Sequence, residues 1–202
     1  MYQVLKRDGG TVEFEISKIS NAMIKAFEAQ NRQYHPSIIN LLALQVCADF
    51  ESKIKELGFL VKLDTNGSNP QMVKELAEKN LVDYIAMDVK NSPAMYAQTV
   101  GLEKIDLAPI EESLRFLIGG EVDYELRTTL VSQLHNGASI QDMGQWLGSL
   151  VTGLKPKKLF LQSFVDRDTV LFAGLTPPES ETTAEFAKIL APFAGTVTIR
   201  NP

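Results

Sequence analysis

The chain has 202 residues, of which 45% are hydrophobic and 22% are charged, a composition typical of globular proteins. Its formal net charge is -5 at pH 7, so it offers no overall positive field to a nucleic acid. No apolar run approaches the roughly 20 residues of a membrane-spanning helix, and the polar N-terminus does not resemble a secretion signal. We therefore expect a cytoplasmic protein that binds neither nucleic acid nor membrane. Composition leaves the oligomeric state open, a homodimer included.

Metal-binding residue types are scarce in this sequence. Cys47 is the only cysteine, which excludes an intrachain disulfide. A cluster held by cysteines takes about four thiolates, or three with an exchangeable ligand, so we expect no iron–sulfur cluster in this chain alone. Neither His35 nor His135 has a partner at metal-ligand spacing, and both are expected to be solvated.

The N-terminal quarter predicts a hairpin followed by two helices. Two short apolar stretches flank the turn residues Asp8 and Gly9, which is a strong hairpin signal. The helical apolar period then predicts one helix from Ser17 to about Gln30 and a second from Ser37 to about Leu57.

After Gly58, strands and helices alternate. The predicted strands are 59–64, 83–89, 122–131, 158–162 and 196–199, and the predicted helices are 70–80, 108–118, 140–151 (capped by Ser139) and 179–190. Four or five strands separated by helices predict an α/β fold with a parallel sheet and right-handed crossovers.

Polar residues gather where the predicted strands end. They are Asp64, Thr65, Asp88, Lys90, Arg127 and Gln162. In parallel sheets, ligands bind outside the carboxyl ends of the strands, so these groups would converge on one rim. Their oxygens could hold a hard cation, and Lys90 and Arg127 could hold a carboxylate or phosphate of an anionic or zwitterionic ligand. The same residue types also suit ordinary turn and capping chemistry, which needs no ligand.

Four segments resemble one family in order: GFLVKLDTNGSNP, LVDYIAMDVKNSP, DYELRTTLV and LFLQSFVDRD. The family is the radical S-adenosylmethionine activating enzymes of anaerobic ribonucleotide reductase, and the resemblance runs from about Lys53 to Arg200. It implies a partial TIM-type barrel. It also implies that Asp64, Thr65 and Asp88 surround a monovalent cation beside the S-adenosylmethionine carboxylate. Lys90 and Arg127 would contact that cofactor, and Gln162 would lie near it.

The sequence also departs from that family. The family begins with strands that carry a Cys-x3-Cys-x2-Cys motif and a Gly-Gly-Glu-Pro-like motif, and neither occurs here. Without these thiolates no cluster forms, and no electron reaches the sulfonium. The missing strands would also leave a sheet edge that must be covered.

The N-terminus carries a second resemblance. The segment from Tyr2 to about Ala29, YQVLKRDGGTVEFEISKISNAMIKAFEA, resembles the start of an ATP-cone, the nucleotide-sensing module of ribonucleotide reductases. The resemblance implies that Lys6, Arg7 and Lys18, with Glu13 between them, contact ATP or dATP. Cations near a helix N-terminus suit phosphates, although the same spacing also describes a simple charged hairpin.

Together these patterns predict a truncated ATP-cone-like segment over residues 1–52 and a partial radical S-adenosylmethionine barrel over 53–202. We expect a remnant or accessory protein of anaerobic deoxyribonucleotide synthesis that lacks radical chemistry and has anaerobic ribonucleotide reductase as its partner. One alternative is an activase whose cluster strands come from another chain. Another is a nucleotide-responsive interaction module whose helices cover the open sheet edge.

Overall fold

The computed structural model describes residues 3–5, 11–13, 16–29, 39, 60–166, 170 and 172–200. The chain divides into two compact units, Met1–Lys62 with Asn80–Val82, and Leu63–Lys79 with Asp83–Pro202. The domain boundary expected after residue 52 stays a prediction. Apart from residue 39, the helix predicted over 37–57 lies outside the described residues. In the part of the chain that is described, no helix combines the length and the apolar character needed to cross a bilayer.

The first unit contains the predicted hairpin and first helix. Strands β1 (Gln3–Leu5) and β2 (Thr11–Glu13) pair antiparallel, with Val4 opposite Val12. Helix α1 spans Ile16–Ala29, within one residue of the range predicted from its apolar period.

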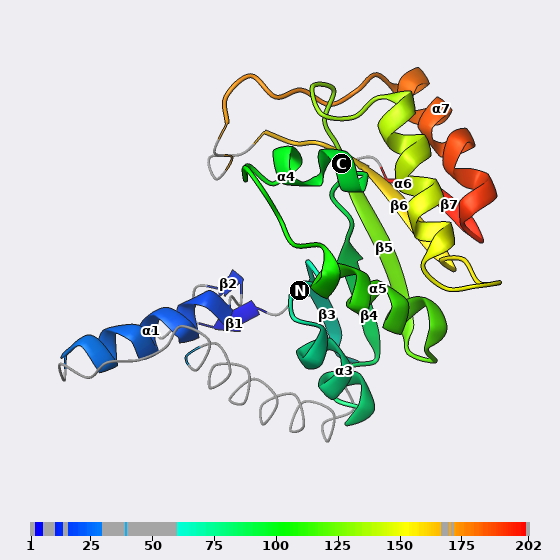
Figure 1. Ribbon diagram of the computed structural model, residues 1–202. Helices are drawn as coiled ribbons and strands as arrows, with labels where there is room; N and C mark the ends of the chain where they lie inside the picture. Colours follow the sequence, from blue (N-terminus) through cyan, green and yellow to red (C-terminus); the bar gives the residue numbers. More distant parts are fainter. Residues whose placement is uncertain are drawn as a thin grey trace. The chain divides into compact units, whose positions relative to one another are not determined.

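The second unit is built on a five-stranded sheet of order β3-β4-β5-β6-β7 (Figure 1). Its strands are β3 (Lys62–Thr65), β4 (Tyr84–Asp88), β5 (Asp123–Leu130), β6 (Lys158–Ser163) and β7 (Thr196–Arg200). The pairs β4-β5, β5-β6 and β6-β7 are parallel. The predicted α/β class and parallel sheet are therefore confirmed.

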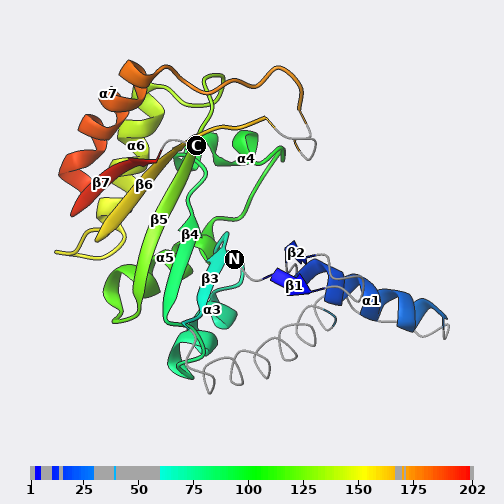
Figure 2. The same cartoon turned by 180° about the vertical axis from the view of Figure 1, so that it is seen from behind.

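Helices of this unit cover one face of the sheet. They are α3 (Pro70–Glu78), α4 (Pro93–Thr99), α5 (Ala108–Gly119), α6 (Gly137–Ser149), α7 (Ser180–Leu190) and the 3-10 turn η1 (Ala191–Phe193). Helices α3, α5, α6 and α7 lie in front of the strands in Figure 1, and the view from behind shows the strands in front of these helices (Figure 2).

The two faces of the sheet differ in chemistry because strand side chains alternate. Thr128 on β5 donates to the sulfur of Met143 on α6 at 3.8 Å, so this residue points toward the helices. Its neighbour Arg127 points to the opposite face. The fully buried residues on the helix side include Ile85, Met87, Leu126, Leu159 and Leu161. Asp88 and Arg127, two of the groups predicted at the rim, pair in register and lie on the other side.

Helix α6 begins earlier than predicted. Its N-cap is Asn136, whose side chain accepts from the Ser139 amide at 2.9 Å, while the Ser139 hydroxyl accepts from the Asn136 amide at 3.1 Å. This reciprocal capping box satisfies two amide donors at once. The prediction that Ser139 caps the helix is therefore wrong, because Ser139 occupies the third helical position.

A glycine closes the turn after β3. Gly67 has φ +74°, its amide donates to the Thr65 hydroxyl at 3.1 Å, and its carbonyl accepts from the Ser113 hydroxyl at 2.8 Å. A Cβ atom at this position would lie 2.0 Å from the terminal methyl of Met87, which is fully buried. The backbone conformation therefore favours glycine, and any larger residue would make the end of the Met87 side chain move.

We expect Gly67→Ala to lower the free energy of unfolding by about 2–3 kcal/mol, because it adds a core clash to the strain of positive φ. Gly153→Ala is the matched control, since Gly153 has φ +76° and nothing within 4 Å of the added Cβ. It should cost only about 1 kcal/mol. Urea unfolding followed by the fluorescence of Trp146, the sole tryptophan, measures both. Equal losses would show that Met87 moves aside without cost.

Candidate functional site

Three neighbouring strands bring four charged side chains together. Asp64 and Asp88 lie at the carboxyl ends of β3 and β4, whereas Arg127 lies within β5, three residues before its last residue, so the expectation that Arg127 marks a strand end is wrong. Arg127 on β5 donates from Nε to Asp88 Oδ1 at 3.0 Å, and its Nη2 lies 2.9 Å from the same oxygen. Its Nη1 reaches Asp64 Oδ2 on β3 at 3.2 Å. Lys90, just past the end of β4, donates to Asp88 Oδ2 at 2.8 Å. We call Asp64, Asp88, Lys90 and Arg127 the rim cluster.

Accessibility differs within the rim cluster. The Arg127 side chain is 15% exposed and Asp88 is 26% exposed, whereas Asp64 is 56% exposed. Burial by itself lowers the pKa of Arg127, but the negative charges of Asp88 and Asp64 outweigh it and raise the pKa above its usual value. The guanidinium is therefore fixed as a cation, and its more accessible partner is Asp64.

The rim cluster includes four of the six residues predicted there. The Thr65 hydroxyl accepts from the Gly67 amide and so orders the turn after β3. Gln162 pairs in register with Thr129, two positions beyond Arg127, and no hydrogen bond joins it to the rim cluster in the described chain. The binding roles of all six residues stay predictions.

A metal site was also expected at the rim. Within the described ranges, no group of three or more His, Cys, Asp or Glu side chains could hold a metal ion. The rim itself supplies two carboxylates, Asp64 and Asp88. The monovalent cation stays a prediction.

Only two of the four residues predicted to contact a nucleotide lie in the described part of the chain. Glu13 lies in β2 and Lys18 lies in the first turn of α1. Lys6 and Arg7 fall outside the described residues. His35 and Cys47 also fall outside them.

His135 is a residue whose importance the sequence did not reveal. It is 4% exposed, so the prediction that it is solvated is wrong. Its Nε2 lies 2.9 Å from the Lys90 carbonyl, and its Nδ1 accepts from the Val131 amide at 3.1 Å. Burial lowers the pKa of His135 despite the backbone carbonyls of Lys90 and Val131, which raise it. A histidine followed by Asn-Gly looks like an exposed turn in sequence, and only the fold brings it against the end of β4.

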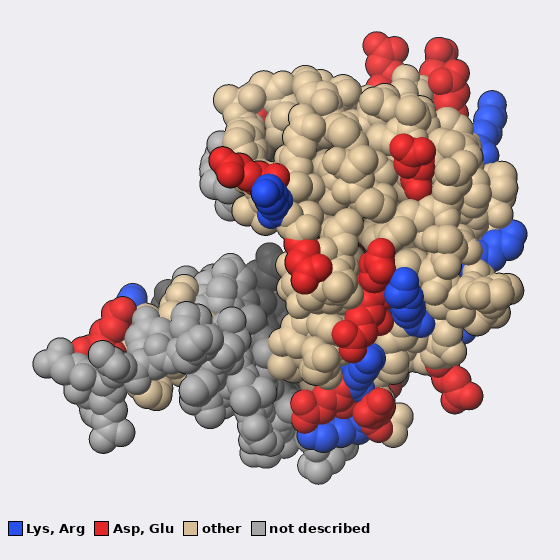
Figure 3. Space-filling model, in the orientation of Figure 1, with Lys and Arg blue, Asp and Glu red and all other residues tan. Residues whose placement is uncertain are grey.

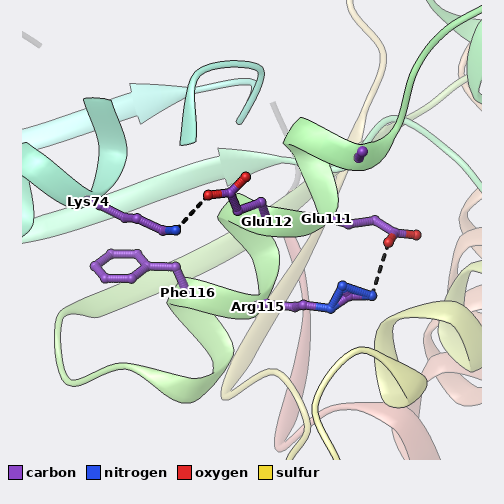
Figure 4. A pocket seen from close by; sticks show the side chains of 6 residues that line it. Lys74, Glu111, Glu112, Arg115 and Phe116 are labelled. Atoms are coloured by element: carbon purple, nitrogen blue, oxygen red, sulfur yellow. Dashed lines mark hydrogen bonds and ion pairs between the residues drawn. The ribbon is translucent and has the colours of Figure 1, made fainter. Parts of the chain in front are cut away.

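A separate pocket of about 500 Å³ lies between α3 and α5 (Figure 4). Lys74 pairs with Glu112 at 2.6 Å across it, and Arg115 pairs with Glu111 at 3.0 Å. Its charged groups thus already neutralise one another. On the face shown in Figure 3, basic side chains are interspersed with acidic ones and do not form a continuous patch. The rim cluster, which joins three strands beside the carboxyl ends of β3 and β4, remains the stronger candidate site.

Comparison with solved structures first defines the class of fold. The chain is similar to a domain of a pyruvate-formate lyase-activating enzyme from Bacteroides vulgatus, with TM-score 0.60 and 18% identity over 79% of this chain and 92% of that one. It is also similar to a radical SAM methyltransferase from Sphaerobacter thermophilus, with TM-score 0.55 and 16% identity over 72% of this chain and 42% of that one. At these identities the likeness shows the fold alone.

Sequence comparison is more specific. Over 154 residues the chain is 31% identical to a protein of Methanocaldococcus jannaschii described as a glycyl-radical enzyme activating enzyme. The match covers 73% of this chain and 61% of that relative. The ATP cone domain family matches residues 2–87, which extends past residue 52 through β3, α3 and β4. Both predicted resemblances, to glycyl-radical activating enzymes and to the ATP-cone, are therefore confirmed.

We expect the two rim carboxylates to contribute unequally to stability. Asp88→Ala leaves the largely buried Arg127 without its closest partner and should cost about 1–3 kcal/mol of unfolding free energy. Asp64→Ala removes an exposed partner and should cost less than about 1 kcal/mol. Urea unfolding of the two variants, monitored by Trp146 fluorescence, compares them. A larger loss for Asp64→Ala would contradict the inferred order.

Proposed function

We propose that the second unit binds S-adenosylmethionine at the rim cluster. We further propose that the chain is an accessory protein of anaerobic deoxyribonucleotide synthesis that lacks radical chemistry of its own. The observation that carries the proposal is the joining of Asp64, Asp88, Lys90 and Arg127 across three neighbouring strands. The similarity to a glycyl-radical enzyme activating enzyme supports the choice of ligand.

The rim cluster suits the amino-acid end of S-adenosylmethionine. That end carries an ammonium and a carboxylate, and the cluster carries two cations and two carboxylates. A ligand carboxylate would pair with Arg127 in place of Asp64, the partner with the greater exposure and the longer contact. The released Asp64 could then accept from the ligand ammonium. This exchange keeps both the ligand and the site electrically balanced.

An iron–sulfur cluster does not fit the residues of this chain. Its one cysteine, Cys47, cannot replace the three thiolates that such a cluster needs. We therefore derive no radical step here, and propose instead that the chain acts beside a glycyl-radical enzyme, with anaerobic ribonucleotide reductase as the partner. Iron and sulfide analysis after anaerobic reconstitution of the pure chain should find no stoichiometric cluster. If a cluster forms only when an activase chain is added, the shared-cluster alternative gains support.

Calorimetry should detect S-adenosylmethionine binding to the unmodified protein. Asp88→Ala and Arg127→Ala should each weaken it at least about tenfold, because each removes a charge-assisted contact worth roughly 1.5–3 kcal/mol. Lys74→Ala is the matched control, since it also breaks an ion pair but lies in the pocket between α3 and α5. Absence of heat with the unmodified protein, or equal weakening by Lys74→Ala, would contradict the proposal.

A second candidate function is nucleotide response, which the match of the ATP cone domain family to residues 2–87 favours. ATP or dATP should then bind, and Lys6→Ala should weaken binding about tenfold by removing one phosphate contact. Lys25→Ala, an exposed lysine later in α1, serves as the control. Equal affinities of Lys6→Ala and the unmodified protein for both nucleotides would exclude the predicted hairpin contact.

A further inference from the structure

Lys90, in the segment that follows β4, has the long and flexible side chain typical of lysine. The Val89 amide donates to the Arg127 carbonyl at 2.8 Å, which extends the pairing of β4 with β5 by one residue. Lys90 then leaves the sheet, and its ammonium turns back to Asp88. The position of the Lys90 backbone therefore decides where this ammonium lies on the rim.

His135 holds that backbone from the neighbouring loop. Its Nε2 lies 2.9 Å from the Lys90 carbonyl, which can only accept, so Nε2 must carry a proton. Its Nδ1 lies 3.1 Å from the Val131 amide and 3.2 Å from the Val131 carbonyl, and in the tautomer with a protonated Nε2 it accepts from the amide. One neutral imidazole thus ties the end of β5 to the residue after β4, and it does so with 4% of its surface exposed.

Asn91 makes a second connection in the opposite direction. Its amide nitrogen donates to the Leu134 carbonyl at 2.8 Å and to the Thr99 hydroxyl at 3.0 Å. Its side-chain oxygen accepts from the Ser92 amide at 2.8 Å. Asn91 and Ser92 are both fully buried. Residues 90–91 and 134–135 are therefore joined by two hydrogen bonds, one donated from each loop.

An aromatic pair lies beneath this connection. Tyr96 is 1% exposed, and its ring meets Trp146 edge to face with centroids 6.2 Å apart. Burial raises the pKa of Tyr96 to about 12, with smaller effects from the Lys90 backbone and the Asp88 charge. Its buried hydroxyl forms no hydrogen bond within the described residues. Tyr96, on the helix that follows this segment, therefore belongs to the buried core.

We propose that His135 is a positioning residue for the rim cluster, which together with Asn91 fixes the backbone of Lys90 so that its ammonium faces the ligand. The assignment rests on the proposed binding of S-adenosylmethionine. An ammonium on a flexible stem binds an anion well only if its backbone is held, because small displacements weaken charge-assisted contacts steeply. A purely structural histidine, 4% exposed, would need the same acceptor for its N–H group, so ligand affinity and amide exchange must separate the two roles.

Two substitutions separate positioning from packing. His135→Gln can place an amide donor where Nε2 lies and so keep the bond to the Lys90 carbonyl. His135→Asn can accept from the Val131 amide but is too short to reach Lys90. Gln133→Ala is the loop control, because Gln133 forms hydrogen bonds with Gly174 and Thr176 and none with Lys90 in the described part of the chain.

The full chain is tested by calorimetry with S-adenosylmethionine and by amide hydrogen exchange of residues 89–92 without ligand. His135→Asn should weaken affinity about tenfold and speed exchange over 89–92, whereas His135→Gln and Gln133→Ala should stay within about threefold of the unmodified protein. If His135→Gln and His135→Asn behave alike in exchange, the positioning role is overturned. If exchange separates them but the unmodified protein binds no S-adenosylmethionine, the proposed ligand fails while the hold on Lys90 stands.

Discussion

Parallel register between β4 and β5 is the constraint from which the site follows. It sets Asp88 directly beside Arg127, and the two-residue period of a strand turns both side chains away from the helices. The same alternation buries Met87 and Leu126 on the other face. A slip of one residue would bury the charged pair among apolar side chains and expose the core. The apolar face therefore fixes the position of the charges.

The guanidinium of Arg127 makes this arrangement costly to disturb. A cation that is only 15% exposed needs anionic partners, and Asp88 and Asp64 supply them from two other strands. The pairs tie three strands together, so one group serves both the fold and the candidate site. A ligand can most easily displace the carboxylate that contributes least to stability. Asp64 is more exposed than Asp88, so we expect a ligand to displace Asp64 first.

Most of the fold could be predicted from sequence because its signals are local. Alternating strands, amphipathic helices and charges near strand ends all lie within short windows. The convergence of Asp64, Asp88, Lys90 and Arg127 followed from parallel topology alone. The burial of His135 could not be predicted in this way, because Lys90, whose carbonyl its ring contacts, is 45 residues away in the sequence. The N-cap Asn136 was also missed, because Asn-Gly equally suggests a free turn.

Self-pairing within the rim cluster limits how tightly it could hold a ligand. Each cation already has a carboxylate, so a zwitterion gains only the difference between its own contacts and those it displaces. Neither the zwitterionic ligand nor the self-paired rim cluster carries a large net charge, so salt has little long-range attraction between them to screen. The affinity for the ligand should therefore depend only weakly on salt concentration. A site of this kind selects by geometry more than by charge. The fixed positions of Arg127 and Lys90 then matter more than their net electrostatic field, which is why the hydrogen bonds that hold the Lys90 backbone belong to the chemistry of the rim.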